Sequence, residues 1–403
     1  MKVAIVKLGD MYQELGYSHY PDWLSPQKRG RKVLFIDTCF PVTSRDAASA
    51  AAVNEIKLFQ ALNYEVTFLA LDDHLINTQS QRFFNQAGVR AEAFRDVNEA
   101  ITWLKLHANQ YSFFFVTRFH VLERTSQALR FWAPHARIIL NLADLHYLRE
   151  SRLMASSGQS HEQVQMIKQR ELQQIRQADK VLSYSEHELD ILIHQEQINP
   201  SSLSLCPWVK ESETCNIQMD QRADIMFLGN FGHAPNKEGL SWFIERIWPK
   251  VRLKLPDVHL LICGAKSDSL NEQWAMIDGI RIMGWIEDLT PVYQSARVFV
   301  APLCSGAGVK GKVIDALAHG LPTVMTTIAA EGIPVVNTQE AFITDNEHEW
   351  VEYLTDLYSN RLIWNKMSAS SCQFVSAHYH WQRGLDQLKN ILDDVSEKTV
   401  KEQ

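Results

Sequence analysis

The 403-residue sequence contains no long hydrophobic run and no C-x-x-C pair. Apolar stretches such as Val298–Leu303 fall far short of the roughly 20 residues that a membrane-spanning helix needs. The first eight residues hold only four consecutive apolar residues after Lys2, too few for a signal-peptide core. The six cysteines are scattered singly, and most lie in or beside apolar runs. We therefore expect reduced core thiols and a cytoplasmic location.

A strongly basic half is also absent, because residues 1–209 hold 22 Lys and Arg against 22 Asp and Glu, and the remainder carries the whole formal net charge of −7. This charge balance excludes a nucleic-acid footprint. One basic cluster, Lys28–Lys32, is either a solvated linker before a strand or a contact with anionic lipid head groups or a charged acceptor. Peripheral contact with the inner face of the membrane is therefore kept as an alternative.

Short apolar runs alternate with helical periodicity through most of the chain, which is typical of parallel sheets covered on both faces. Strands are predicted at Lys32–Asp37, Tyr64–Leu71, Tyr111–Val116, Arg137–Leu142 and Lys180–Ser183, and then at Asp224–Leu228, His259–Cys263, Arg281–Met283, Arg297–Ala301 and Thr323–Thr326. Helices are predicted at about Ala47–Leu62 and Glu162–Gln177. The restart of the pattern predicts two doubly wound α/β domains, with ligands at the carboxyl ends of the strands in the cleft between them.

We expect the chain to divide into five parts. They are an N-terminal extension at 1–30, a first Rossmann-like domain at 31–209, a linker at 210–222, a second Rossmann-like domain at 223–380, and a C-terminal helix and tail at 381–403.

Residues 306–312 read GAGVKGK and contain the G-x-G-x-x-G spacing of dinucleotide-binding loops. At least three predicted strands precede this loop in its domain, whereas a dinucleotide loop normally follows the first. The next helix also ends after about nine residues, at Gly320-Leu321-Pro322. We therefore favour another phosphate ligand over a dinucleotide.

A strand that runs through glycines into a helix N-terminus presents unpaired amides and a positive dipole end to an anion. Lys310 and Lys312 add two charges at what we expect to be an exposed helix entrance. Asp315 follows one turn later, where it either accepts hydrogen bonds from a ribose diol or pairs with Lys312. A phosphate loop beside a sugar-binding acid describes a nucleotide diphosphate, and no Walker lysine pattern is present.

An ordered set of motifs resembles group 1 glycosyltransferases, close to glycosyltransferase family 4, across roughly residues 31–385. The motifs include FLGNF at 227–231, Pro235-Asn236, GWIEDL at 284–289, VAPL at 300–303, GAGVKGK at 306–312, GLPTV at 320–324, and Asp144-Leu145-His146. The resemblance implies the GT-B fold: two Rossmann-like domains facing across a cleft, with a C-terminal helix returning to the first.

The resemblance also implies roles for individual residues. Donor-binding residues would be Gly229, Asn230, His233, Asn236, Trp285, Ile286, Gly308, Val309, Lys310, Gly311, Lys312, Asp315 and Glu331. The two lysines, Asp144 and His146 would be catalytic, and Asp46 and Arg149 would bind the acceptor. His146 follows a strand end, and its alternative role is to cap the next helix.

Departures from the family pattern bear on the donor, and one of them is Asp315, which is one methylene shorter than the usual Glu. A Glu that many relatives use to contact the donor sugar is Ala307 here, and the usual Arg after the first strand of the second domain is Asn230. No Asp-x-Asp is present and His378-Tyr379-His380 lacks a third ligand, so no metal and no cofactor are expected.

The resulting expectation is a retaining glycosyltransferase that moves a sugar from a nucleotide diphosphate to a glycan or lipid-linked acceptor in bacterial surface polysaccharide synthesis. Two alternatives remain open. One is a non-hydrolysing nucleotide-sugar 2-epimerase, and the other is a non-catalytic scaffold that binds donor or glycan.

Overall fold

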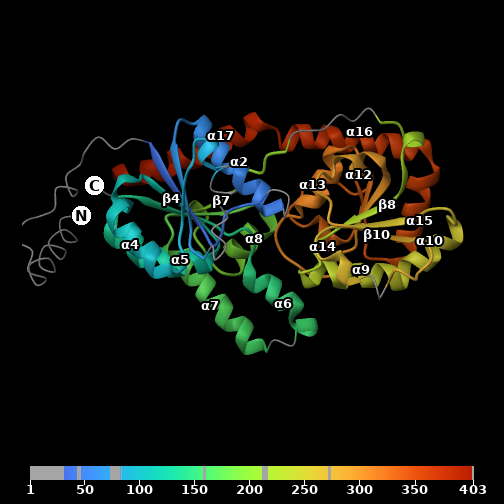
Figure 1. Cartoon of the computed structure of the whole chain (residues 1–403), viewed down its shortest axis with the longest axis horizontal. Coiled ribbons are helices and arrows are strands. Elements are labelled where there is room, and N and C mark those ends of the chain that lie inside the picture. The colour runs from blue at the N-terminus through green and yellow to red at the C-terminus, as the bar shows by residue number, and fades with distance from the viewer. Residues whose placement is uncertain are drawn as a thin grey trace, which may run out of the picture.

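The computed structural model describes residues 31–42, 47–72, 82, 84–157, 160–210, 217–270 and 274–401. Two parallel sheets lie side by side, each covered by helices (Figure 1). The first has seven strands in the order β3-β2-β1-β4-β5-β6-β7, and the second has six in the order β10-β9-β8-β11-β12-β13. The predicted GT-B architecture of two doubly wound domains is confirmed.

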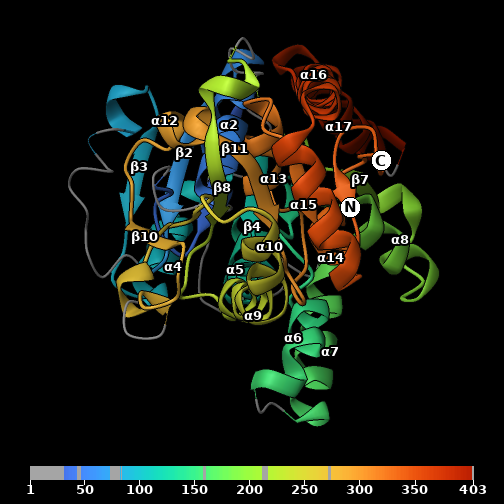
Figure 2. The ribbon, with the colours of Figure 1, turned by 90° about the vertical axis from the view of Figure 1, so that its right-hand side faces the viewer.

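The first sheet is built from β1 (Lys32–Asp37), β2 (Glu65–Ala70), β3 (Arg90–Ala93), β4 (Phe113–Thr117), β5 (Arg137–Asn141), β6 (Lys180–Ser183) and β7 (Leu203–Leu205). Its helices are α2 (Ala47–Ala61), α4 (Val97–His107), α5 (Phe119–Trp132), α6 (His146–Ser157), α7 (His161–Gln177) and α8 (Glu186–His194). Helices α6 and α7 form a hairpin that projects from the body of the protein (Figure 2).

The second sheet contains β8 (Ala223–Leu228), β9 (Leu260–Cys263), β10 (Ile280–Gly284), β11 (Ala296–Ala301), β12 (Thr323–Met325) and β13 (Phe342–Ile343). Around it lie α9 (Ala234–Trp242), α10 (Trp248–Lys254), α12 (Thr290–Ser295), α13 (Gly311–Ala318), α14 (Thr327–Ala330), α15 (Glu347–Ser359) and α16 (Arg361–His378). A π-helical segment at Phe243–Ile247 joins α9 to α10.

The middle positions of the central strands are apolar on both faces because both faces of each sheet are buried. On β1, Leu34 and Ile36 enter one core cluster, while Val33 and Phe35 enter the cluster on the opposite face. The predicted strands at these central positions are confirmed. The short edge strands β3, β7 and β13 were not predicted.

The last helix, α17 (Trp381–Lys401), returns to the first domain (Figure 1). Leu388 and Leu392 on α17 are buried in the core cluster that contains Val33. Lys180 on β6 pairs with Asp394 at 2.7 Å. The predicted C-terminal crossing is therefore confirmed.

The cysteines differ from expectation at one position. Cys39, Cys206, Cys263 and Cys304 are free. Cys372 on α16 is disulfide-bonded, so the prediction that all six thiols are reduced is wrong for this residue.

Candidate functional site

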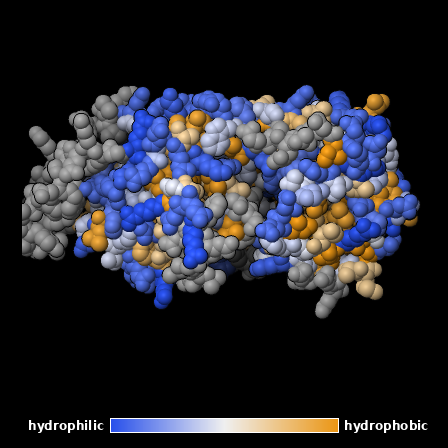
Figure 3. All heavy atoms as spheres, turned by 45° about the horizontal axis from the view of Figure 1, so that its top comes forward, coloured by the Kyte–Doolittle hydropathy of each residue, from blue (hydrophilic) through white to orange (hydrophobic). Residues whose placement is uncertain are grey.

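Loops at the carboxyl ends of strands in the two sheets touch each other directly. The loop after β5 contains Asp144, and the GAGVKGK loop after β11 contains Gly308. A Cβ atom on Gly308 would lie 2.9 Å from the Cβ of Asp144, and its φ of +69° also favours glycine. A space-filling view shows a narrow notch between the two halves of the molecule (Figure 3). Only glycine at position 308 permits this close approach to Asp144.

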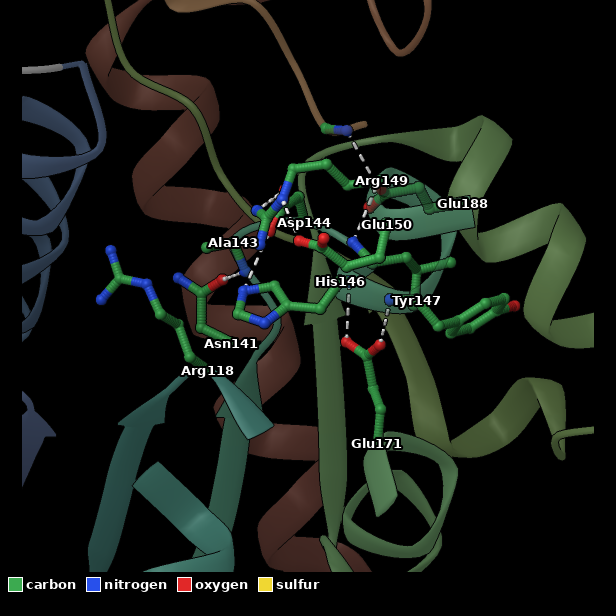
Figure 4. A network of polar contacts seen from close by, with 12 residues as sticks. Arg118, Asn141, Ala143, Asp144, His146, Tyr147, Arg149, Glu150, Glu171 and Glu188 are labelled. Carbon is green, nitrogen blue, oxygen red and sulfur yellow. Dashed lines mark hydrogen bonds and ion pairs between the residues drawn. The ribbon is translucent and has the colours of Figure 1, made fainter. Parts of the chain in front are cut away.

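Asp144 organises the wall contributed by the first domain (Figure 4). Its carboxylate lies 3.3 Å from His146 Nε2 and also accepts a hydrogen bond from the Arg149 guanidinium. Burial alone would raise the pKa of Asp144, but His146 and Arg149 together lower it to about 2. Three predicted site residues are thus brought together around one ionised carboxylate. The fourth predicted residue of this domain, Asp46, lies outside the described residues.

A second group on the same wall was not predicted as part of the site. The ring of His120 lies 5.5 Å from that of His146, and burial and the charge of His146 lower the pKa of His120 to about 4. Arg118 has a φ of +74° and pairs with Asp37 at 2.6 Å, which joins the carboxyl ends of β1 and β4. These strands flank the point where the strand order of the sheet reverses, where ligands bind in such folds.

In the sequence Asp37 is a strand end, a position that suits either a site residue or a cap of the next loop. In the structure its Oδ1 accepts a hydrogen bond from the Thr38 amide at 2.7 Å as well as from Arg118. Burial raises the pKa of Asp37 although the Arg118 charge opposes this shift. No local sequence signal marks the backbone conformation of Arg118.

The lysines of the GAGVKGK loop are less accessible than the sequence suggested. Lys310 precedes α13 and is only 7% exposed, and its Nζ donates to the Gly308 carbonyl at 2.7 Å. Lys312 donates to the Leu228 carbonyl at 2.8 Å and lies over the ring of Phe227. The expectation of an exposed helix entrance is therefore wrong.

Burial also changes the charge state of these lysines. It lowers the pKa of Lys310 to about 8, although Glu331 and Glu188 oppose the shift. It lowers the pKa of Lys312 to about 7, and the neighbouring Lys310 charge adds to the effect. A bound anion would raise the pKa values of both lysines and so restore the charge that burial partly removes near neutral pH.

The segment after β8, a loop that leads into α9, contacts Lys312 through one side chain. Asn236 Oδ1 accepts from Lys312 Nζ at 2.6 Å, and Asn236 Nδ2 donates to the Asn230 carbonyl at 2.9 Å. The Gly229 amide donates to the Cys263 carbonyl at 3.0 Å, and the His233 amide donates to the Asn230 carbonyl at 3.1 Å. The structure thus brings this predicted loop to the start of α13.

The remaining predicted donor residues lie on the same side of the second domain, and several contact the first domain or the linker. Asp315 pairs with Lys210 at 3.1 Å rather than with Lys312, so the i, i+3 pair is not formed. Glu331 forms a two-pronged ion pair with Arg152 of α6, at 2.6 and 2.8 Å. Trp285 follows β10 and is 52% exposed. Ile286 packs partly buried against the core, as does Val309.

The Gly308 amide is engaged by a residue that the sequence did not single out. Glu188 of α8 accepts a hydrogen bond from this amide at 2.8 Å. Gly311 begins α13, so the amides of residues 310–312 lie at the helix N-terminus. An anion-binding role at this loop therefore falls mainly on Lys310, Gly311 and Lys312.

Two further properties concern only the part of the chain that the structure describes. None of its helices is long and apolar enough to cross a membrane. Within the same residues, no group of three or more His, Cys, Asp or Glu side chains is arranged to hold a metal ion.

Two facing Rossmann-like domains with these loops at their contact define the GT-B class. The fold is similar to a glycosyltransferase from Rickettsia africae, with a TM-score of 0.68 at 10% identity, covering 91% of this chain and 98% of that one. It is also similar to Anabaena HepE in complex with UDP and glucose, with a TM-score of 0.66 at 11% identity, covering 90% and 99%. At these identities the likeness shows the fold.

The family assignment rests on the second domain. Residues 222–360 match the family described as glycosyl transferases group 1, so the predicted resemblance is confirmed. An uncharacterized 44.6 kDa protein in the cps region of Klebsiella pneumoniae is 25% identical over 164 residues. That match spans 39% of this chain and 42% of the relative.

Proposed function

We propose that the protein is a glycosyltransferase that moves a sugar from a nucleotide diphosphate to a glycan or lipid-linked acceptor. One observation carries this proposal. The N-terminus of α13, with Lys310 and Lys312, lies on the second-domain wall, and its loop touches the Asp144–His146 wall of the first domain. This arrangement supports an anion site and a set of hydrogen-bonding side chains on opposite sides of one contact.

In this proposal the diphosphate binds at the start of α13. Charge develops on the diphosphate as the glycosidic bond breaks, and preorganised amides and cations stabilise that charge with little rearrangement. Lys310 and Lys312 supply the cations. Asp315 binds the ribose after leaving Lys210, and the Trp285–Ile286 backbone contacts the base.

The acceptor side is assigned to the first domain. Asp144 holds His146 and Arg149 toward the contact between the domains, where they orient the acceptor hydroxyl and the transferred sugar. Asp46 is kept as an acceptor-binding residue in the proposal. The reaction is proposed to proceed with retention of anomeric configuration and without a metal ion.

Similar proteins give the proposal its setting. Anabaena HepE holds UDP and glucose, which makes UDP-glucose the first donor to test. The relative in a cps region favours a role in bacterial surface polysaccharide synthesis. We infer a cytoplasmic location, with peripheral contact at the inner face of the membrane when the acceptor is lipid-linked.

The test begins with thermal-shift titration against UDP-, GDP-, ADP- and CMP-linked sugars. A donor at a hundred times its dissociation constant stabilises the fold by about 2.7 kcal/mol. Transfer is then measured with the donor that binds, and the anomeric proton of the product is assigned by NMR. Conversion of the nucleotide sugar without acceptor would identify an epimerase, and donor binding with no turnover would identify a scaffold.

Variants locate the diphosphate. Lys310→Ala and Lys312→Ala are expected to weaken donor binding, and at least one should lose more turnover than affinity, because the charge on the diphosphate grows in the transition state. Lys389→Ala on the exposed face of α17 is the matched control. Parent-like binding and turnover in both loop variants would refute the assignment.

A further inference from the structure

The N-terminus of α6 is held by carboxylates from two other helices. Glu171 of α7 accepts from the His146 amide at 3.1 Å and from the Tyr147 amide at 2.9 Å. Glu188 of α8 accepts from the Leu145 amide at 3.0 Å (Figure 4). Three consecutive amides that a helix start leaves without internal partners are thus satisfied by two glutamates. The backbone that carries His146 is thereby fixed from outside its own helix.

Glu188 differs from Glu171 because it also reaches the other domain. Its Oε1 accepts from the Gly308 amide at 2.8 Å while it accepts from Leu145. Its Oε2 accepts from the Ser183 hydroxyl at 2.6 Å, and the residue is only 1% exposed. One buried oxygen therefore binds one backbone amide from each wall of the site.

A second contact between the domains serves as a comparison. Arg152 of α6 donates to the Gly306 carbonyl at 2.6 Å and pairs with Glu331. This contact holds the same loop but leaves the backbone next to His146 untouched. Of Arg152 and Glu188, only Glu188 links the residue before His146 to the GAGVKGK loop.

We propose that Glu188 is a positioning residue, which sets the distance between the His146 wall and the GAGVKGK loop by binding Leu145 and Gly308 with one oxygen. The role rests on the proposed transfer function. Displacing reacting groups by about 1 Å can cost about a hundredfold in rate, so an oxygen shared between the walls controls turnover more than donor binding.

Glu188→Asp and Glu188→Gln form a matched pair for the test. Aspartate keeps the charge but is one methylene shorter, so its oxygen cannot reach both amides. Glutamine keeps the length and the accepting oxygen, and its amide group can donate to the Ser183 hydroxyl, which is able to accept. Glu186→Gln, at an exposed position of the same helix, is the control.

Hydrogen exchange of the peptide spanning residues 304–312 and transfer kinetics with UDP-glucose are measured for each variant. For Glu188→Asp we expect about tenfold faster exchange at Gly308 and about a tenfold or greater loss of kcat, with the donor KM within about threefold of the parent. Glu188→Gln should keep kcat within about threefold of the parent value and keep Gly308 protected.

The opposite ranking, with the aspartate variant active and the glutamine variant inactive, would show that charge rather than reach matters and would overturn the proposal. So would parent kinetics in the aspartate variant. Failure of the transfer function itself would be seen separately, as absence of product with the parent protein and every donor tested. The exchange measurement does not depend on turnover, so an unchanged Gly308 signal in the aspartate variant would refute the shared contact on its own.

Discussion

Binding of a nucleotide sugar is expected to draw protons from solution at pH 8. The pKa of Lys310 is lowered to about 8 and that of Lys312 to about 7, both by burial. At pH 8 the first lysine is therefore about half protonated and the second about one-tenth protonated. A diphosphate beside them favours the charged form of each, so their pKa values rise on binding.

Full protonation of both lysines at pH 8 takes up about 1.4 protons for each donor bound. At pH 6 both are already charged, and their contribution falls to about 0.1 proton. Without donor, these two lysines change the free energy of unfolding with pH in the opposite direction to a lysine in an ordinary ion pair. Because the folded state binds fewer protons than the unfolded state between pH 7 and the usual lysine value of 10.5, the free energy of unfolding rises with pH across that window.

Calorimetric titration with UDP-glucose in two buffers of different ionisation enthalpy measures the uptake directly. A nucleotide sugar is the right probe because its esterified diphosphate has no group that titrates near pH 7. Glu188, with a pKa raised by burial to about 6, is already ionised at pH 8 and adds little there. Lys312→Met should lower the uptake at pH 8 by about 0.9 proton. Binding with less than about 0.2 proton taken up by the parent would refute the coupling between the bound diphosphate and the protonation of these lysines.

Three further outcomes follow from individual contacts. His146→Ala should lose product formation while UDP still shifts the melting temperature as in the parent, because His146 lies on the opposite wall; a lost UDP shift would contradict its placement. Gly239→Ala should lower the free energy of unfolding in urea by about 3 kcal/mol, since its Cβ would lie 2.3 Å from the Pro302 carbonyl oxygen. A variant as stable as the parent would show that the backbone can relax around the added methyl group. Burial raises the pKa of Glu55 to about 7, so the folded state binds this proton more tightly than the unfolded state does. The free energy of unfolding of the parent should therefore fall by about 3 kcal/mol between pH 4.5 and 7, relative to that of Glu55→Gln. Parallel pH curves for the two proteins would show that Glu55 does not titrate in this range.

The central strands could be predicted because burial on both faces makes them continuous apolar runs. The edge strands could not, because Arg90–Ala93 and Leu203–Leu205 are short and carry polar residues at the margins of the first sheet. A short strand with polar residues lacks the continuous apolar run on which the prediction of a strand depends. The same reasoning explains β13, which has only two residues.

The site also has a part that could be predicted from the sequence and a part that could not. The GAGVKGK loop and the Asp144-Leu145-His146 segment were readable because each follows a recognisable strand. Gly308 and Glu188 are 120 residues apart, and Arg152 and Glu331 are 179 apart, so no local pattern connects them. The burial of Lys310 is equally invisible, since it depends on how closely the two domains approach.

The contacts at the second-domain wall differ in how easily a donor can replace them. The Lys210–Asp315 pair has side chains that are 25% and 35% exposed, and ion pairs of this kind contribute about 0 to 1 kcal/mol. Arg152 and Glu331 are less exposed, joined by two hydrogen bonds, and also tied to the Gly306 carbonyl. Exchange of Lys210 for a ribose diol therefore costs little, whereas separating Arg152 from Glu331 would release the loop from the first domain. It follows that the proposed donor enters most easily at Asp315 and the start of α13, while the contacts of Arg152 and Glu188 keep the two walls together during transfer.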